Sequence, residues 1–310
     1  MHGVNRGLGR GWPGSLGAAR LIWKWTRLPE VLLLSGAALT GFCLASDSLP
    51  DPLRLALLVL SVLACGGHIM IVNALLGRAL LAADSETMDY PIRGAEWRPG
   101  ALKLLAWVLL AVAMAGLVAL APGAALAGAG IVAVWFLYAH PVVRLKGRPF
   151  ADTLVHVVAG LLQFFLGALA VPAVLDRRLW LWAVFPTLVL VAGHFHHVIK
   201  DVAADRAAGL RTVGVTLGSR SCFVIGSLVF LGAYLHLGWL LAAERWPRGA
   251  LVLAALTAMS HVVAAVAFGA RVSAGEAGAV VRYRATYRAL SLLIGTAILW
   301  GCLASWNLLG

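Results

Sequence analysis

Charged residues are scarce in this chain. Asp, Glu, Lys and Arg together make up 12% of its 310 residues, and only 13 residues are acidic. Soluble domains carry about 25% charged residues. Hydrophobic residues make up 61% of the chain and stand in long blocks. The length alone would suit two soluble domains, but this composition excludes them and favours an integral membrane protein.

Cysteines are also few, and no two of them form a C-x-x-C pair. Because the four are scattered, we expect neither a disulfide framework nor a thiolate metal site. They are Cys43, Cys65, Cys222 and Cys302. The first apolar run, Val31–Ala45, follows a basic segment, but no A-x-A cleavage site follows it. We therefore expect this run to remain as the first membrane span rather than to be removed as a signal peptide.

Nine apolar blocks are long enough to cross a bilayer, for which about 20 residues suffice. A hydrocarbon layer offers no partner for backbone N–H and C=O groups, so each block should be a helix. The sequence predicts an all-α, polytopic membrane protein that forms a single domain over residues 1–310. The nine predicted spans are 30–46, 53–77, 102–121, 124–142, 153–175, 179–199, 221–243, 249–270 and 289–309.

The excess of basic residues follows the predicted topology. With the amino terminus in the cytoplasm, 20 of the 25 Lys and Arg residues lie on the cytoplasmic side and five lie outside. Cytoplasmic loops of membrane proteins carry such an excess. This distribution explains the net charge of +12 without a nucleic-acid partner. It predicts a basic cytoplasmic segment at residues 1–28 and an external carboxyl terminus.

The sixth predicted span runs into the most informative stretch, residues 194–218. Asp201 and Asp205 are four residues apart, so on a helix they share one face. Paired carboxylates beside cations suit a Mg²⁺ ion that carries a diphosphate, because Mg²⁺ is held by one or two carboxylates and by phosphate oxygens. An ordinary charged loop would explain the same residues equally well. The neighbouring cations are Lys200, Arg206 and Arg211.

A family resemblance decides between these two interpretations. The run K-D-V-A-A-D-R-A-A-G-L-R-T at Lys200–Thr212, followed by V-T-L-G at Val215–Gly218, closely resembles the second aspartate motif of the UbiA superfamily of intramembrane prenyltransferases. Three further segments resemble family motifs in the same order along the chain. They are W-T-R-L-P at Trp25–Pro29, P-I-R-G at Pro91–Gly94 and Y-A-H-P-V-V-R-L-K-G-R-P at Tyr138–Pro149.

The resemblance implies a nine-helix bundle around a central cavity, with Mg²⁺ as cofactor and a prenyl diphosphate as substrate. Cytoplasmic active-site loops at 78–101 and 200–220 would cap the cavity. In this scheme Asp201 and Asp205 hold one Mg²⁺ ion. The diphosphate would be bound by Tyr138, Lys146, Lys200, Arg206 and Arg211.

The chain departs from the family at the first aspartate motif. Asn73 matches the motif's asparagine, but Ala74, Gly77 and Leu81 stand where the family has aspartates. Asp84 is displaced from the last of these positions, and a small insertion or deletion would make it the motif's last acid. Asn73 and Asp84 are therefore the predicted ligands of a second Mg²⁺ ion. The spacing from Asn73 to Gly77 also resembles the motif of superfamily members that cyclise terpenes.

Polar residues within the spans are weaker candidates. His194, His196 and His197 could contact substrate, but neighbouring positions on one helix diverge, which argues against a zinc site built from them alone. Gln163 lies inside the fifth predicted span, where polar groups usually face a cavity.

The sequence therefore predicts a membrane prenyltransferase that ionises a prenyl diphosphate and transfers the prenyl group to an aromatic or other small acceptor, with release of pyrophosphate. Two alternatives remain open. One is a terpene cyclase acting on the prenyl diphosphate itself, and the other is a noncatalytic scaffold or transporter.

Overall fold

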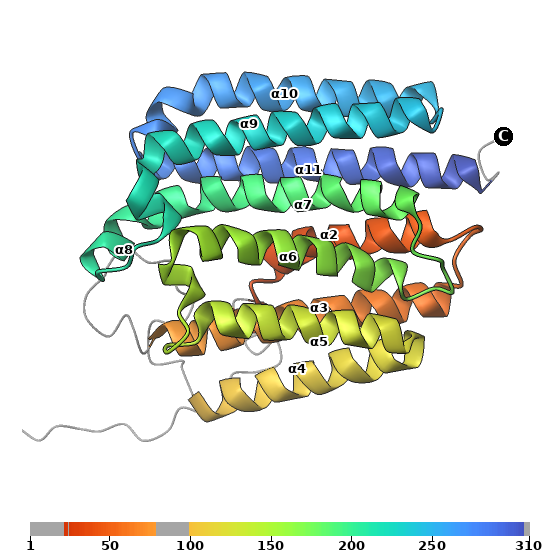
Figure 1. The fold of residues 1–310 in the computed structure, drawn as a ribbon, viewed down its shortest axis with the longest axis horizontal. Coiled ribbons are helices and arrows are strands. Elements are labelled where there is room, and N and C mark those ends of the chain that lie inside the picture. The colour runs from red at the N-terminus through yellow and green to blue at the C-terminus, as the bar shows by residue number, and fades with distance from the viewer. Residues whose placement is uncertain (1–21, 24, 79–98, 307–310) are drawn as a thin grey trace, which may run out of the picture.

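The computed structural model describes residues 22–23, 25–78 and 99–306. These residues form no strand, and nine of their helices are long and apolar enough to cross a membrane. The helices lie side by side with their long axes roughly aligned (Figure 1). The predicted all-α fold and the nine predicted spans are confirmed.

The amino-terminal part of the bundle contains five long helices and one short 3-10 helix. The first four long helices are α2 (Leu28–Ala45), α3 (Pro52–Arg78), α4 (Pro99–Leu120) and α5 (Pro122–Ala139). A short 3-10 helix, η1 (Leu145–Gly147), leads into α6 (Pro149–Ala168). Proline stands in the first turn of α2, α5 and α6, where its missing N–H group would have no intrahelical acceptor.

The carboxyl-terminal part continues with α7 (Arg177–Val198), which runs directly into η2 (Ile199–Asp201) and the short helix α8 (Val202–Ala207). Three long helices follow, α9 (Val213–Ala243), α10 (Arg248–Ser273) and α11 (Ala277–Ser305). Figure 1 places α8 at one end of the bundle, beside the beginning of α9. One apolar core joins α6, α7, α9, α10 and α11, and a second joins α2 to α6.

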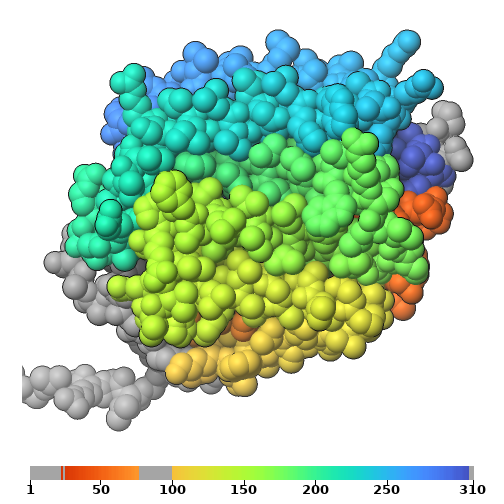
Figure 2. All heavy atoms as spheres, viewed as in Figure 1, coloured from red at the N-terminus to blue at the C-terminus, as the bar shows by residue number. Residues whose placement is uncertain are grey.

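The contact between α2 and α6 brings the two cores together. Two glycines permit this approach, because a Cβ atom on Gly41 would overlap the carbonyl oxygen of Phe164, and one on Gly167 would overlap that of Ala38. Small residues let membrane helices pack backbone against backbone. In Figure 2 the viewed face is a closed surface formed by side chains of α5, α6, α7, α9 and α10. Large apolar side chains such as Leu154, Trp180 and Leu235 are exposed on the outside of the bundle.

The start of the last span and the predicted loop at 200–220 differ from the structure. Helix α11 begins at Ala277 rather than 289, so Arg282, Arg284 and Arg288 are helical residues and not part of a loop. Helix α9 begins at Val213 but is kinked at Gly218, whose φ of 78° is not helical, and the predicted start at 221 lies just after this kink. The segment 200–220 is mostly helical, with residues 208–212 outside helices and Gly218 at the kink. Hydropathy marks the apolar length of a helix, whereas the backbone hydrogen bonds continue through polar turns at its end.

Candidate active site

The chain reverses between α8 and α9 through a glycine turn. Gly209 has a φ of 67°, a conformation that glycine adopts at no steric cost. The Gly209 N–H donates to the Arg206 carbonyl over 3.1 Å, and the Leu210 N–H donates to the Asp205 carbonyl over 2.9 Å. Thr212 then caps α9 by accepting a hydrogen bond from the Val215 N–H. This glycine-terminated turn keeps α8, and with it Asp205, against the start of α9.

Asp201 and Asp205 are the two predicted metal ligands at this end of the bundle. Asp205 is almost fully buried, and its Oδ1 lies 3.6 Å from Nζ of Lys146. Asp201 is more accessible, and its two carboxylate oxygens lie 3.5 Å from Nζ of Lys200 and 3.6 Å from Nε2 of His197. Lys146 comes from η1, so the site joins the segment after α5 to the end of α7.

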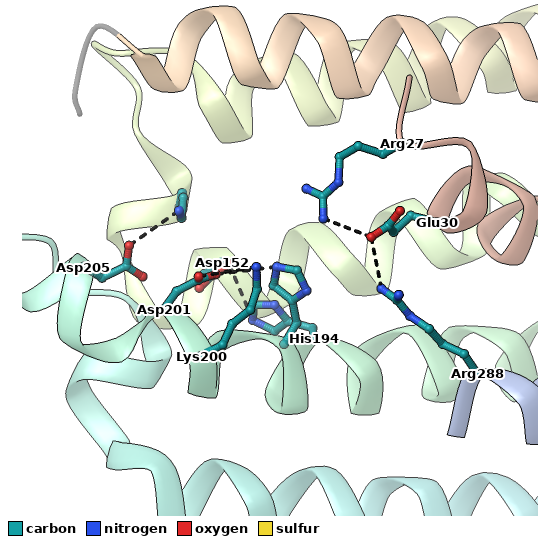
Figure 3. Close-up of polar contacts among 10 residues, drawn as sticks. Arg27, Glu30, Asp152, His194, Lys200, Asp201, Asp205 and Arg288 are labelled. Atoms are coloured by element: carbon teal, nitrogen blue, oxygen red, sulfur yellow. Dashed lines mark hydrogen bonds and ion pairs between the residues drawn. The ribbon is translucent and has the colours of Figure 1, made fainter. Parts of the chain in front are cut away.

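Two arginines that the sequence did not assign to the site lie near this cluster. Both Arg27 and Arg284 interact electrostatically with Lys200. Arg284 is 8% exposed, and its Nε has no hydrogen-bond partner among the described residues. Arg27 precedes α2 and pairs with Glu30 at 3.1 Å, and Arg288 of α11 approaches the same carboxylate at 3.4 Å (Figure 3). The resemblance of Trp25–Pro29 to a family motif was the available signal for Arg27.

A second group of polar side chains lies beside the two aspartates. Asp152 on α6 and His194 on α7 are both buried, with 3.5 Å between Oδ1 and Nε2, and Figure 3 places them next to Asp201 and Lys200. Tyr138, a predicted diphosphate ligand, interacts with Asp152 and with both Asp201 and Asp205. The sequence analysis did not select Asp152 as a site residue. The sequence feature that could have identified it is its position as a single acid directly before the predicted span 153–175, because ionisable groups are uncommon in membrane spans.

Asn73 lines an apolar pocket between α2, α3, α5 and α6. Its Oδ1 is buried and has no hydrogen-bond partner among the described residues. The pocket lining also includes Gln163 and Trp135. The Trp135 ring contacts Tyr138 at 5.2 Å between centroids and His156 at 5.1 Å. Trp135 therefore borders both the pocket and the polar group around Asp152.

The remaining predicted site residues are not gathered in the same way. Arg206 and Arg211 are exposed, and neither forms an ion pair with an acid in the described part of the chain. Asp84 lies outside the described residues, as do most of segments 78–101 and 1–28. His196, in contrast to His194, packs among aromatic rings and beside Gly226 of α9, away from the acids.

These features define a polytopic α-helical membrane protein with a pair of aspartates and several cations at one end of its bundle and an apolar pocket between its helices. The sequence model of the UbiA prenyltransferase family matches residues 34–283, which is most of the chain. The chain belongs to the UbiA prenyltransferase family, and its predicted class, a membrane prenyltransferase, is confirmed.

Two kinds of curated relatives match parts of the chain. The lycopene elongase/hydratase of Haloferax volcanii is 27% identical over 229 residues, which cover 68% of this chain and 72% of the relative. A digeranylgeranylglyceryl phosphate synthase of Halobacterium salinarum is 36% identical over 92 residues, covering 29% of this chain and 32% of that protein.

Solved structures of UbiA homologues share the fold. The apo structure from Aeropyrum pernix has a TM-score of 0.70 at 19% identity, and it covers 88% of this chain and 98% of its own. The structure of the Archaeoglobus fulgidus homologue bound to DMAPP and Mg²⁺ has a TM-score of 0.67 at 16% identity, with coverage of 93% and 99%.

Proposed function

We propose that this protein transfers a prenyl group from an allylic prenyl diphosphate to a small acceptor inside the bilayer, in a reaction that requires Mg²⁺. The observation that carries the proposal is the position of Trp135, which borders both the apolar pocket and the polar group beside Asp201 and Asp205. A diphosphate at the acids and an isoprenoid chain in the pocket would then meet at this residue.

The donor set fits Mg²⁺. Asp201 and Asp205 supply carboxylate oxygens, and Asp205 Oδ2 is buried without a hydrogen-bond partner among the described residues. Mg²⁺ prefers such oxygen ligands and keeps waters or phosphate oxygens in its other positions. When bound, the ion neutralises charge on a departing diphosphate as a Lewis acid. The structure of the A. fulgidus homologue with DMAPP and Mg²⁺ supports the same pairing of ion and substrate here.

The chain's own residues would bind and orient the substrate. Lys146 and Lys200 lie beside the two aspartates, and Arg27 and Arg284 extend the positive charge from α2 and α11. Cations placed where charge develops on the leaving group stabilise the transition state more than the bound ester. The apolar pocket excludes water from the allylic cation, and the Trp135 ring can stabilise that cation by a cation–π interaction.

A product assay tests this proposal. Purified protein in lipid is incubated with Mg²⁺ and ten-, fifteen- or twenty-carbon prenyl diphosphates, with and without an acceptor. The names of the relatives suggest lycopene and a glyceryl phosphate ether as acceptors, and an aromatic acceptor is the third choice. We expect pyrophosphate release together with a prenylated acceptor. A protein that releases no pyrophosphate with any combination would contradict the proposal and support a scaffold or transporter.

Terpene cyclisation is the second candidate, and one observation favours it. Helix α3 carries Asn73 with no acid in the turn that follows, at Ala74 and Gly77, which resembles the motif of cyclising relatives. In the same assay a cyclase would release pyrophosphate and form a cyclic hydrocarbon or alcohol without any acceptor. We propose further that the end of the bundle carrying Asp201 faces the cytoplasm, because 20 of 25 basic residues fall on that side in the nine-span topology.

A further inference from the structure

Three potential metal-ligating side chains converge between α6 and α7, beside the two aspartates assigned to Mg²⁺. Asp152 and His156 stand one turn apart on α6, and His194 faces them from α7. One ligand atom of each residue lies within 4.8 Å of the others. The Asp152 and His194 side chains are 1% and 2% exposed, and His156 is 7% exposed. The sequence argued against zinc at His194 because its neighbours on α7 diverge, but the converging ligands come from α6.

The separation of Asp152 and His194 suits two ligands of one ion. Oδ1 and Nε2 are 3.5 Å apart, beyond the usual range of about 2.7–3.2 Å for a hydrogen bond. Two ligands at about 2.0–2.1 Å from a tetrahedral Zn²⁺ ion lie roughly 3.4 Å apart. Both Asp152 oxygens and His194 Nε2 are buried and have no partner at hydrogen-bonding geometry among the described residues, although the Tyr138 hydroxyl and the Val213 N–H interact with Asp152. A buried carboxylate with only these partners is stabilised further by a shared cation or proton.

His156 carries the secondary contact typical of a metal ligand. Its Nδ1 lies 2.8 Å from the Asp152 carbonyl oxygen, so Nδ1–H donates and Nε2 keeps its lone pair. Histidines that bind metals commonly donate the other ring N–H to a carbonyl or carboxylate in this way. The His156 ring also stacks on that of His194 with 3.8 Å between centroids, and Trp135 and Tyr138 lie edge-on to it. The hydrogen bond fixes the His156 tautomer, but both Nε2 lone pairs reach one ion only when the two rings rotate out of this stack.

We propose that Asp152, His156 and His194 form a binding site for a divalent transition metal of the Zn²⁺ class, with ligands other than those of the adjacent Mg²⁺ site. Two imidazoles and one carboxylate suit Zn²⁺, whereas Mg²⁺ prefers oxygen ligands alone. An ion held by these residues would join α6 to α7. This site goes beyond the proposed prenyl transfer and does not depend on it.

Metal binding is measured directly on the full-length protein in lipid nanodiscs. The protein is stripped with a chelator, exposed to Zn²⁺ in the presence of excess Mg²⁺, desalted and analysed for metal by mass spectrometry. We expect about one tightly held Zn²⁺ per chain, and a rise in thermal unfolding temperature on Zn²⁺ addition. Co²⁺ in place of Zn²⁺ should give the visible absorption of a four-coordinate site with nitrogen and oxygen ligands.

Variants locate the ion. Asp152→Asn and His194→Ala should each weaken Zn²⁺ binding by about 100-fold or more, since loss of a contacting partner outside the ligand set already costs about 10–100-fold. His236→Ala is the matched control, because His236 is a partly buried histidine on α9 that contacts the Leu181 carbonyl and the Trp239 ring and lies outside the proposed ligand set. Asp201→Asn should also retain Zn²⁺. Size-exclusion profiles identify any variant that fails to fold.

Two outcomes would overturn the site. One is a wild-type protein that retains no Zn²⁺ after desalting, and this result favours a proton shared by Asp152 and His194. The other is equal retention by wild type, Asp152→Asn and His194→Ala, which would place the ion elsewhere. Neither outcome depends on prenyl transfer, whose failure is detected separately as a lack of pyrophosphate release with Mg²⁺.

Discussion

Asp205 and Lys146 form an ion pair at one end of the bundle, with 3.6 Å between Oδ1 and Nζ and with the aspartate side chain only 2% exposed. The two residues are far apart in the sequence and meet because η1 and α8 lie at the same end of the structure. A buried carboxylate with one oxygen toward a lysine and the other unpartnered is suited to share its charge with a bound cation.

Asp201→Asn and Asp205→Asn should each reduce prenyl transfer by at least about 100-fold, because each removes a carboxylate from the Mg²⁺ site. The measurement is pyrophosphate release under saturating substrate, repeated over a range of Mg²⁺ concentrations. Glu276→Gln, in the exposed ion pair with Arg271, is the matched control and should retain full activity. Near-normal turnover in both aspartate variants would refute their role.

Arg284→Met should weaken binding of the prenyl diphosphate. A charge-assisted hydrogen bond contributes about 1.5–3 kcal/mol, which corresponds to roughly a 10–100-fold rise in KM. Arg282→Met is the natural comparison, since Arg282 stands two residues away on α11 and is exposed. The two variants should differ clearly in KM, and equal values would remove Arg284 from the diphosphate site.

Variants of the altered first aspartate motif distinguish two arrangements of the second Mg²⁺ site. If Asp84 supplies the carboxylate of a second Mg²⁺ site, Asp84→Ala should raise the Mg²⁺ concentration that gives half-maximal rate, and Asp89→Ala should have little effect. If the site uses Asn73 instead, Asn73→Ala should be severe and Asp84→Ala mild. We expect the first result, because a single metal leaves the diphosphate charge poorly balanced. Indifference to both changes would mean that this motif no longer binds metal.

Gly167→Ala should destabilise the bundle. The added methyl group would overlap the Ala38 carbonyl, so α2 and α6 would have to separate, at a cost of about 1–3 kcal/mol or more. Thermal unfolding in detergent measures this change. Gly232→Ala provides the comparison, because a Cβ atom there has no neighbour within 4 Å among the described residues. An unchanged unfolding temperature for Gly167→Ala would show that the α2–α6 approach is less constrained than the packing indicates.

Reporter fusions test the orientation. A fusion at Gly209 should report the cytoplasm, and one at Ala243, at the opposite end of α9, should report the outside. Gly209 lies just before the start of α9, and Ala243 is its last residue. If α9 spans the membrane, the two fusions must report opposite sides. An external signal at Gly209 would reverse the proposed side of the active site.

The bundle could be predicted from the sequence because lipid imposes a simple rule, that each long apolar block must become a helix. The helix ends could not. Arg282 lowers the local hydropathy, yet α11 begins before it at Ala277, and a kink at Gly218 divides the start of α9. The error at α11 arises because the helix is longer than its apolar stretch.

Two of the predicted site residues lie together because their geometry is local. The spacing of Asp201 and Asp205 belongs to one segment, and both residues lie in the same cluster. Arg284 and Asp152 are different, because they reach the cluster through packing of α11 and α6 against α7, which no single stretch of sequence reveals. Arg206 and Arg211, which the family motif suggested as diphosphate ligands, are exposed.

The apolar pocket is lined from α2, α3, α5 and α6, whereas Asp201 and Asp205 belong to the segment that ends α7. In the proposed reaction, the diphosphate group of the substrate and its hydrocarbon tail are bound by largely separate segments of the chain. Substitutions at Met70 or Leu34 in the pocket lining can then alter the preferred chain length while the bond-breaking chemistry is preserved. Such a division would allow one ancestral enzyme to diversify its products stepwise, and laboratory evolution confined to the pocket could follow the same route.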